Sequence, residues 1–376
     1  MSFQLVAVAE ETPIKVPTEG GQVTLSFPNT IGLSQVLDLN DRGQLLGMRE
    51  VPLANIGLEQ ETFFYDDSGP HVVPKLEDFT NVQPESISNT GRVVGYVSRE
   101  IGHPEGSLLG FVWDAPDGEL QGLAALPDYH ASHATDISAD GRRVVGYSTG
   151  RNPPRMTPCL WEEADGKWTC TPLETIHAYN PYLLTSRIVI NDGGTKIAAC
   201  ITVRMTPGDL THYDSSLFLW SRQADGNWNR ELVSDNQAKL SDINDRGDIV
   251  GSIRSGSRRQ AFVATARKEF RLLDHLEGDD HSEAMDINNT GTICGYSDDP
   301  RGPEGGPTAV TWNVQDGTEA SRLPLFENVV FSAAQAVNER GQIAGYAVVA
   351  RPPESDVQEA VSEEGTTYSF TWTPEK

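Results

Sequence analysis

Histidine and carboxylate side chains that could exchange protons are the residues of this chain with the clearest chemical potential. The first is His133, because an imidazole titrates near neutral pH and can act as a general acid or base. The second is Glu283, a carboxylate that could exchange that proton if the fold brings the two residues together. We therefore name His133 and Glu283 as candidate catalytic residues, with His281 as an alternative partner for His133.

A metal site is another use of the same region, because Asp128 and His130 precede His133. Two histidines in one short segment are weak support for a metal, since zinc sites in proteins need three or four protein ligands. The motifs H-E-x-x-H, G-x-x-x-x-G-K-[ST] and G-x-G-x-x-G are missing, and with them the common metalloprotease and nucleotide-binding signatures. We therefore assign no metal ligands and expect no cofactor.

The elements that would position these residues come from an internal repeat. The segment 241–251 reads Ser-Asp-Ile-Asn-Asp-Arg-Gly-Asp-Ile-Val-Gly, and six other segments are recognisable copies of it. The copies are 37–47, 85–95, 135–146, 188–199, 285–295 and 335–345. They recur every 44 to 53 residues along the chain, which is typical of a repeat architecture. The copy at 188–199 is the weakest, because Ala199 replaces the closing glycine.

Each repeat predicts four short antiparallel strands. One strand precedes the polar Asn-x-x-Gly turn and a second follows it, both with apolar residues at alternate positions. A third strand usually ends in an aromatic residue, which we expect to pack between neighbouring units, and a fourth strand follows. The tryptophans at this position are Trp113, Trp161, Trp220, Trp312 and Trp372.

Seven such units, without a segment of helical period, predict an all-β fold. We expect one seven-bladed β-propeller domain of four-stranded antiparallel blades that covers residues 1–376. The last repeat ends at its third strand, so we expect an N-terminal strand at 22–27 to complete the last blade and remove an unpaired edge.

The repeat core reads Asp-Ile-Asn-x-x-Gly-x-Ile-Val-Gly-Tyr, and the chain follows it closely from Asp242 and Asp286 and more loosely elsewhere. This core resembles the HAF-repeat family, which is described as a family of extracellular repeat proteins. The resemblance covers all seven units. It implies a β-propeller fold and adds little about activity, because few members have an assigned one.

A propeller sorts the connections between its strands onto two faces. The Asn-x-x-Gly turns share one face, here called the turn face. The links from second to third strand and from one blade to the next share the other, here called the loop-rich face, and function tends to lie on such irregular loops. Residues five positions before each turn are expected to surround the mouth of the central channel on this face. The candidate ligand-binding residues are Gln35, Gln83, His130, His177, Tyr179, Lys239 and His281.

Two sets of residues are given structural roles. Four aspartates lie two residues before the turn position and lack the further acids of a calcium loop, so we expect them to hydrogen-bond within turns or between blades. They are Asp38, Asp136, Asp242 and Asp286. Cys159 and Cys170 would lie directly opposite each other if 163–166 forms the turn between their strands, and we expect both to be free thiols.

The amino-acid composition limits the classes of partner that this chain can bind. With 54 acidic and 29 basic residues the formal charge is −25, which argues against binding nucleic acid or an anionic membrane and favours solubility or a cationic partner. The N-terminus lacks the basic region of a secretory signal, so a cytoplasmic monomer is expected, with secretion after signal removal as the alternative.

The leading hypothesis is a non-catalytic recognition scaffold that binds a protein or peptide through the loop-rich face around the channel. The alternatives are an enzyme, or a binder of a small ligand or carbohydrate, that uses the histidine and glutamate side chains at the channel mouth.

Overall fold

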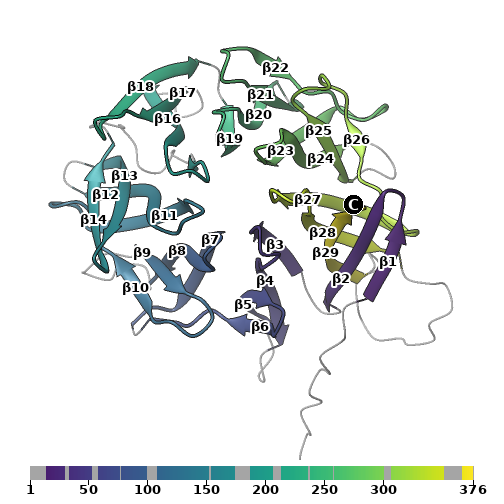
Figure 1. Cartoon of the computed structure of the whole chain (residues 1–376), viewed down its shortest axis with the longest axis horizontal. Helices are drawn as coiled ribbons and strands as arrows, with labels where there is room; N and C mark the ends of the chain where they lie inside the picture. The colour runs from purple at the N-terminus through teal and green to yellow at the C-terminus, as the bar shows by residue number, and fades with distance from the viewer. Residues whose placement is uncertain are drawn as a thin grey trace, which may run out of the picture.

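The computed structural model describes residues 14–29, 34–52, 58–76, 78–99, 108–151, 154–173, 187–205, 213–235, 238–256, 258–299, 306–350 and 366–375. These residues form seven antiparallel sheets in a ring around a central channel (Figure 1). The predicted all-β, seven-bladed propeller is therefore confirmed. Across these ranges, no helix is long and apolar enough to cross a membrane.

Each blade runs outward from a first strand beside the channel. Blade 1 contains β3 (Ser34–Leu39), β4 (Leu45–Pro52), β5 (Leu58–Asp66) and β6 (Gly69–Val72). Blade 2 contains β7 (Asn81–Ile87), β8 (Arg92–Ser98), β9 (Leu108–Asp114) and β10 (Leu120–Leu123). Blade 3 contains β11 (Ala131–Ile137), β12 (Arg143–Arg151), β13 (Pro154–Ala164) and β14 (Lys167–Pro172). Blade 4 contains β15 (Ile188–Ile190), β16 (Lys196–Met205), β17 (Tyr213–Arg222) and β18 (Trp228–Ser234). Blade 5 contains β19 (Ala238–Ile243), β20 (Ile249–Ser255), β21 (Arg258–Ala264) and β22 (Phe270–Leu272). Blade 6 contains β23 (His281–Ile287), β24 (Thr292–Asp298), β25 (Thr308–Asn313) and β26 (Ser321–Arg322).

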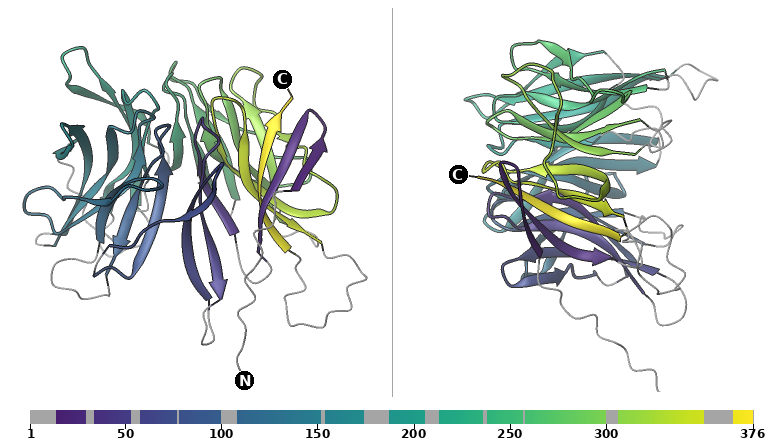
Figure 2. Two further views of the ribbon diagram at one scale, coloured as in Figure 1. Left: turned by 60° about the horizontal axis from the view of Figure 1, so that its bottom comes forward. Right: turned by 90° about the vertical axis from the view of Figure 1, so that its right-hand side faces the viewer.

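Blade 7 joins strands from both ends of the described chain. It contains β27 (Val329–Val337), β28 (Ile343–Val349) and β29 (Thr366–Pro374), and β2 (Gly21–Asn29) pairs with β29. The strand predicted at 22–27 therefore completes the last blade. A strand that we did not expect, β1 (Ile14–Thr18), pairs with the outer edge of β2 (Figure 2). It covers an edge that would otherwise expose unpaired backbone groups.

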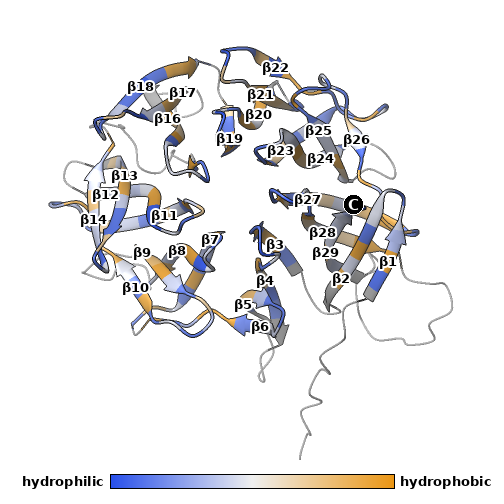
Figure 3. Ribbon diagram, in the orientation of Figure 1, coloured by the Kyte–Doolittle hydropathy of each residue, from blue (hydrophilic) through white to orange (hydrophobic). Residues whose placement is uncertain are grey.

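Buried apolar side chains of neighbouring blades pack together and form the hydrophobic core between them. Hydrophilic residues gather at the turns around the channel (Figure 3). Trp113 of blade 2 packs edge-on against Phe64 of blade 1, with ring centroids 6.1 Å apart. Trp161 is fully buried, and its indole N–H donates to the backbone carbonyl of Ala124 at 2.8 Å. The predicted packing of the recurring tryptophans between blades is confirmed for Trp113, Trp161, Trp220 and Trp312.

The turns around the channel are joined by a closed series of hydrogen bonds, here called the turn belt. Each turn donates a backbone N–H to the corresponding turn of the next blade. The bonds, 2.7 to 3.1 Å long, run from Asp41 N to Asn89 Oδ1, Asn89 N to Ala139 O, Ala139 N to Asp192 O, Gly193 N to Asp245 Oδ1, Asp245 N to Asn289 Oδ1, Asn289 N to Glu339 Oε1 and Glu339 N to Asp41 Oδ1. The last bond returns to blade 1, so the turn belt closes the ring in addition to the pairing of β2 with β29.

Replacing Asn338 by Ala tests this second closure. The Asn338 side chain donates to the Asn40 carbonyl of blade 1 at 3.0 Å and accepts from the N–H of Gln342 at 3.0 Å. Because the side chain is buried, its removal leaves these groups without partners. We expect the free energy of unfolding to fall by about 2 kcal/mol in chemical denaturation. The control Asn227→Ala, in an exposed turn outside the belt, should cost less than about 0.5 kcal/mol. Equal costs would contradict a closing role.

The register of the outer hairpin of blade 3 differs from the prediction. The turn between β13 and β14 has two residues, Asp165 and Gly166, with φ of 51° and 73°, and Ala164 pairs with Lys167. Cys170 consequently pairs with Trp161, and Cys159 with Pro172. The predicted longer turn was wrong, because Asp-Gly adopts the left-handed conformation that the tightest hairpins require. Both cysteines are free thiols.

Candidate functional site

His133 lies near the start of β11 between two tyrosine rings. Tyr147 Oη is 2.5 Å from Nδ1, and Glu85 Oε1 is 3.4 Å from Nε2. The ring centroid of Tyr96 lies 4.0 Å from that of the imidazole. Burial and the Glu85 carboxylate raise the pKa of both tyrosines, so the phenols remain protonated. The imidazole is therefore held in place by three side chains from blades 2 and 3.

Glu283 is only 1% exposed on β23 and accepts hydrogen bonds from three donors. These are the Lys239 ammonium, Arg259 Nη1 at 2.6 Å and the Tyr296 hydroxyl at 3.0 Å. Burial acts to raise the pKa of Glu283, but Lys239 and Arg259 together outweigh it and hold the pKa below its ordinary value. A charged carboxylate with this many partners is a weak base, so its geometry favours a salt-bridge anchor between blades 5 and 6.

The two candidate catalytic residues thus have separate partners. His133 belongs to blade 3 and Glu283 to blade 6, and Figure 1 shows β11 and β23 in different parts of the ring. The alternative partner, His281, forms a 2.5 Å bond to Asp280 Oδ1 through its Nδ1 atom. Proton transfer between His133 and either residue stays a prediction.

The other sequence-predicted residues occupy several places on the loop-rich face. Gln83 donates to Gln60 of blade 1 at 3.1 Å, and Gln35 lies opposite Met48 in blade 1. The side chain of Lys239 is 53% exposed although its ammonium contacts Glu283. Two of the predicted ligand-binding residues, His177 and Tyr179, lie outside the described residues.

Two neighbouring grooves open on the loop-rich face. The groove between blades 1 and 2, here called groove 1–2, has a volume of about 330 Å³. It is lined by Gln60, Glu61, Thr62, Val72, Val73, Lys75, Thr80, Asn81 and Val82. The groove between blades 2 and 3, here called groove 2–3, has a volume of about 260 Å³. It is lined by Phe79, Arg99, Leu108, Leu109, Ala125, Tyr129, His130, Ala131 and Ser132, and so contains the predicted residue His130. The short segment 79–82 separates the two grooves.

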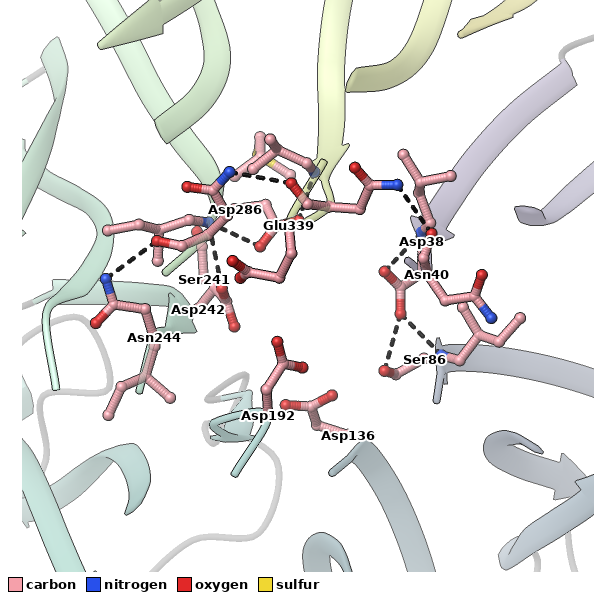
Figure 4. A pocket seen from close by; sticks show the side chains of 18 of the residues that line it. Asp38, Asn40, Ser86, Asp136, Asp192, Ser241, Asp242, Asn244, Asp286 and Glu339 are labelled. Carbon is pink, nitrogen blue, oxygen red and sulfur yellow. Dashed lines mark hydrogen bonds between the residues drawn. The ribbon is translucent and has the colours of Figure 1, made fainter. Parts of the chain in front are cut away.

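A polar cavity that we did not predict lies where the channel reaches the turn face (Figure 4). Its volume is about 90 Å³, and we call it the acidic chamber. The carboxylates that line it are Asp38, Asp41, Asp136, Asp192, Asp242, Asp286 and Glu339. Among the described residues that line the chamber, Arg187 is the one with a cationic side chain. Throughout the described residues, no group of three histidine, cysteine, aspartate or glutamate side chains is placed to hold a metal ion.

A β-bulge brings the deepest of these carboxylates to the chamber. In β11 the register shifts between Ala134 and Asp136, so one extra residue turns the side chain that follows toward the channel. The same shift occurs in β3, β7, β19, β23 and β27. The residue after the bulge is the aspartate of the Asp-x-Asn or Asp-x-Ser pattern in blades 1, 3, 5 and 6.

These aspartates join neighbouring blades, which confirms the predicted hydrogen bonding. Asp38 accepts from the Ser86 hydroxyl at 2.9 Å and from the Ile87 N–H at 2.8 Å. The equivalent bonds run from Ile190 N to Asp136, from Ile287 N to Asp242 and from Val337 N to Asp286, at 2.7 to 3.2 Å.

The chamber favours protonated carboxyl groups. Burial raises the pKa of Asp192 to about 8, and the charges of Glu339 and Asp41 add to the effect. Burial and the Asp286 charge raise the pKa of Asp38 to about 6, and the same two causes place the pKa of Asp242 well above its ordinary value. Several chamber carboxyls therefore take up protons near neutral pH.

The fold and these sites define a seven-bladed β-propeller. Its turn belt and acidic chamber lie on the turn face, and the two grooves lie on the loop-rich face. No protein-family model matches the chain, and no curated protein sequence matches it. Membership of the HAF-repeat family therefore remains an expectation from the repeat core.

Solved structures share the fold at low sequence identity. The β-propeller domain of the Trilobed protease from Pyrococcus furiosus aligns with a TM-score of 0.57 and 11% identity, over 93% of this chain and 95% of that one. That domain is described as having an open velcro topology, whereas blade 7 here is closed by β2. Prolyl oligopeptidase B from Galerina marginata aligns with a TM-score of 0.54 and 12% identity, over 88% of this chain and 48% of that one. Acylaminoacyl peptidase from Pyrococcus horikoshii aligns with a TM-score of 0.50 and 12% identity, over 85% of this chain and 50% of that one. The chain thus spans about half the length of these two peptidases.

Proposed function

We propose that this protein is a non-catalytic recognition scaffold that binds a protein or peptide at the loop-rich face. The observation that carries the proposal is the pair of neighbouring grooves there, groove 1–2 and groove 2–3. Each groove is large enough for a partner side chain, and each combines apolar lining with polar groups that can orient a ligand. Two such grooves separated by one short segment suit an extended peptide, which presents successive side chains to different positions.

The contacts of the two candidate catalytic residues also favour recognition over catalysis. Glu283 is occupied by Lys239, Arg259 and Tyr296, and the ring nitrogens of His133 face Tyr147 and Glu85. These groups are fixed within interblade clusters, so they hold the mouth of the channel in shape. A rigid mouth lowers the cost of ordering the binding surface when a partner docks.

Filling each groove with an indole tests the proposal. Thr80 lies on the rim of groove 1–2 and Ala125 on the rim of groove 2–3. Peptides selected from a displayed random library on the intact protein should bind Thr80→Trp or Ala125→Trp at least tenfold more weakly, because the indole occupies the volume of a partner side chain. The affinities are measured by fluorescence anisotropy, and thermal melting checks that each variant folds.

Matched controls keep the chemistry of the change constant. Thr169→Trp lies on the outermost strand of blade 3, and Ala266→Trp lies at the turn face, both at exposed positions away from the grooves. Both should bind the selected peptides as the parent protein does. If all four variants bind equally well, the grooves are not the recognition surface.

A further inference from the structure

Two cysteines lie on one face of the outer hairpin of blade 3, which β13 and β14 form. Cys170 pairs with Trp161, and Cys159 pairs with Pro172 two positions further along the ladder. Side chains of paired residues point to the same side of a sheet, and so do those two positions apart on one strand. Both thiols accordingly pack in the core between blades 2 and 3, where Cys159 is fully buried and Cys170 is partly exposed.

The hairpin brings the two sulfur atoms together along a diagonal. The backbone N–H of Leu173 donates to the Pro158 carbonyl at 2.9 Å, directly beside the pair that contains Cys159. Hydrogen-bonded and non-hydrogen-bonded pairs alternate, so both cysteines belong to non-hydrogen-bonded pairs, in which side chains approach most closely. The right-handed twist of the strands shortens one diagonal between such pairs. A hydrogen bond between the two thiols shows that Cys159 and Cys170 lie on this diagonal.

The two thiols differ in reactivity. The hydrogen bond with Cys159 lowers the pKa of Cys170, and together with a bond to Ser148 it outweighs the opposing effect of burial. Burial instead raises the pKa of the Cys159 thiol. The thiolate is the nucleophilic form of cysteine, and an oxidant from solution reaches an exposed sulfur first. Cys170 is therefore the sulfur that reacts first, and Cys159 is positioned to react with its product.

We propose that Cys170 and Cys159 form a reversible oxidation site for hydroperoxides. The Cys170 thiolate attacks a peroxide oxygen, so that an S–O bond forms while the O–O bond breaks, and a sulfenic acid and hydroxide result from hydrogen peroxide. The Cys159 sulfur then attacks the Cys170 sulfur. The S–S bond forms, the S–O bond breaks, and the leaving oxygen departs as water with the Cys159 proton. The two sulfurs lose two electrons in total, which the peroxide gains, and a thiol reductant reverses the change.

The disulfide would join the outermost strand of blade 3 to its neighbour at a second place besides the turn at Asp165 and Gly166. It would lie on the face of the hairpin that packs against blade 2. This modification site is independent of the proposed recognition function, because it uses neither of the two grooves.

Peptide mapping of the intact, reduced protein after addition of stoichiometric hydrogen peroxide tests the site. Unfolding in iodoacetamide, followed by trypsin without a reductant, should give the peptides 156–167 and 168–187 as one cross-linked species that has lost two hydrogens. Dithiothreitol added before alkylation should separate them. Cys200 and Cys294 are buried in blades 4 and 6 and serve as internal controls, so both should carry the alkyl label.

Two variants separate the roles of the sulfurs. Cys159→Ser should leave Cys170 as a sulfenic acid that dimedone labels, because the second thiol is missing. Cys170→Ser should give no dimedone adduct at Cys159, because that sulfur is buried. The map of the parent protein needs no variant, so a folding defect in either variant leaves the test intact. Peptides 156–167 and 168–187 that stay separate, or oxidation of Cys200 or Cys294 as fast as that of Cys170, would overturn the inference.

Discussion

Lowering the pH from 8 to 5 is expected to raise the free energy of unfolding of this protein by about 2 kcal/mol, a value discounted for solvent screening because part of Asp192 is exposed. The cause is the acidic chamber, in which burial raises the pKa of Asp192 to about 8 and that of Asp38 to about 6, from 3.8 in both cases. The folded state therefore binds protons more tightly than the unfolded chain does. Such a group stabilises the fold fully below its unfolded pKa, and this contribution is lost as the pH rises through the folded pKa. The loss should fall between about pH 4 and pH 8. Urea denaturation at constant ionic strength measures the free energy of unfolding at each pH.

The substitution Asp192→Asn assigns this effect to the chamber. The amide keeps the shape of the carboxyl but cannot ionise, so the variant should be more stable than the parent at pH 8 and nearly equal to it at pH 5. Asp117→Asn, at an exposed turn outside the chamber, should leave the slope of stability against pH unchanged. A parent protein that is as stable at pH 8 as at pH 5 would contradict the raised pKa values.

Replacing Gly295 by Ala is expected to destabilise the fold by about 3 kcal/mol or more. An added Cβ would lie 2.0 Å from the Glu283 carbonyl oxygen, a backbone atom that cannot move without shifting β23. The approach is close because the bulge in β23 brings that carbonyl toward the partner strand. Chemical denaturation measures the loss.

Two comparisons separate this clash from the general cost of replacing glycine. Gly166→Ala changes a residue with φ of 73° at which an added Cβ would meet no atom within 4 Å, and it should cost about 1 kcal/mol. In blade 4 the pairing of β15 with β16 shows no register shift at Ala199, and the alanine is accommodated there. If Gly295→Ala costs no more than Gly166→Ala, the bulge does not explain the closing glycine.

The architecture could be predicted from the sequence because each repeat folds into one blade of the propeller. Spacing and alternation indicated four strands for each turn, and the strand missing from the last repeat indicated the role of β2. The roles of Asp38 and the recurring tryptophans followed in the same way, since blades that pack radially need partners at their boundaries. The sequence showed that Ala199 replaces the glycine that closes the other repeats. The reason, the absence of a register shift between β15 and β16, could be seen only in the structure.

The features that sequence reasoning missed depend on contacts between blades. One aspartate in an Asp-x-Asn pattern looks like a local turn residue, and only closure of the ring gathers Asp38, Asp192 and Glu339 around one cavity. The grooves were missed for a similar reason, since each is built from the loops of two blades. Among the residues predicted at the mouth of the channel, His130 lines groove 2–3. His133 and Glu283 belong to two separate clusters of side chains.

The turn belt has a consequence for how this protein could diversify. The bonds of the turn belt join turn residues on the turn face, so they do not involve the described connections on the opposite side. We therefore expect changes in the length and sequence of those connections to leave the bonds of the turn belt intact. For the same reason, we expect the loops of one blade to be replaceable without loss of the ring.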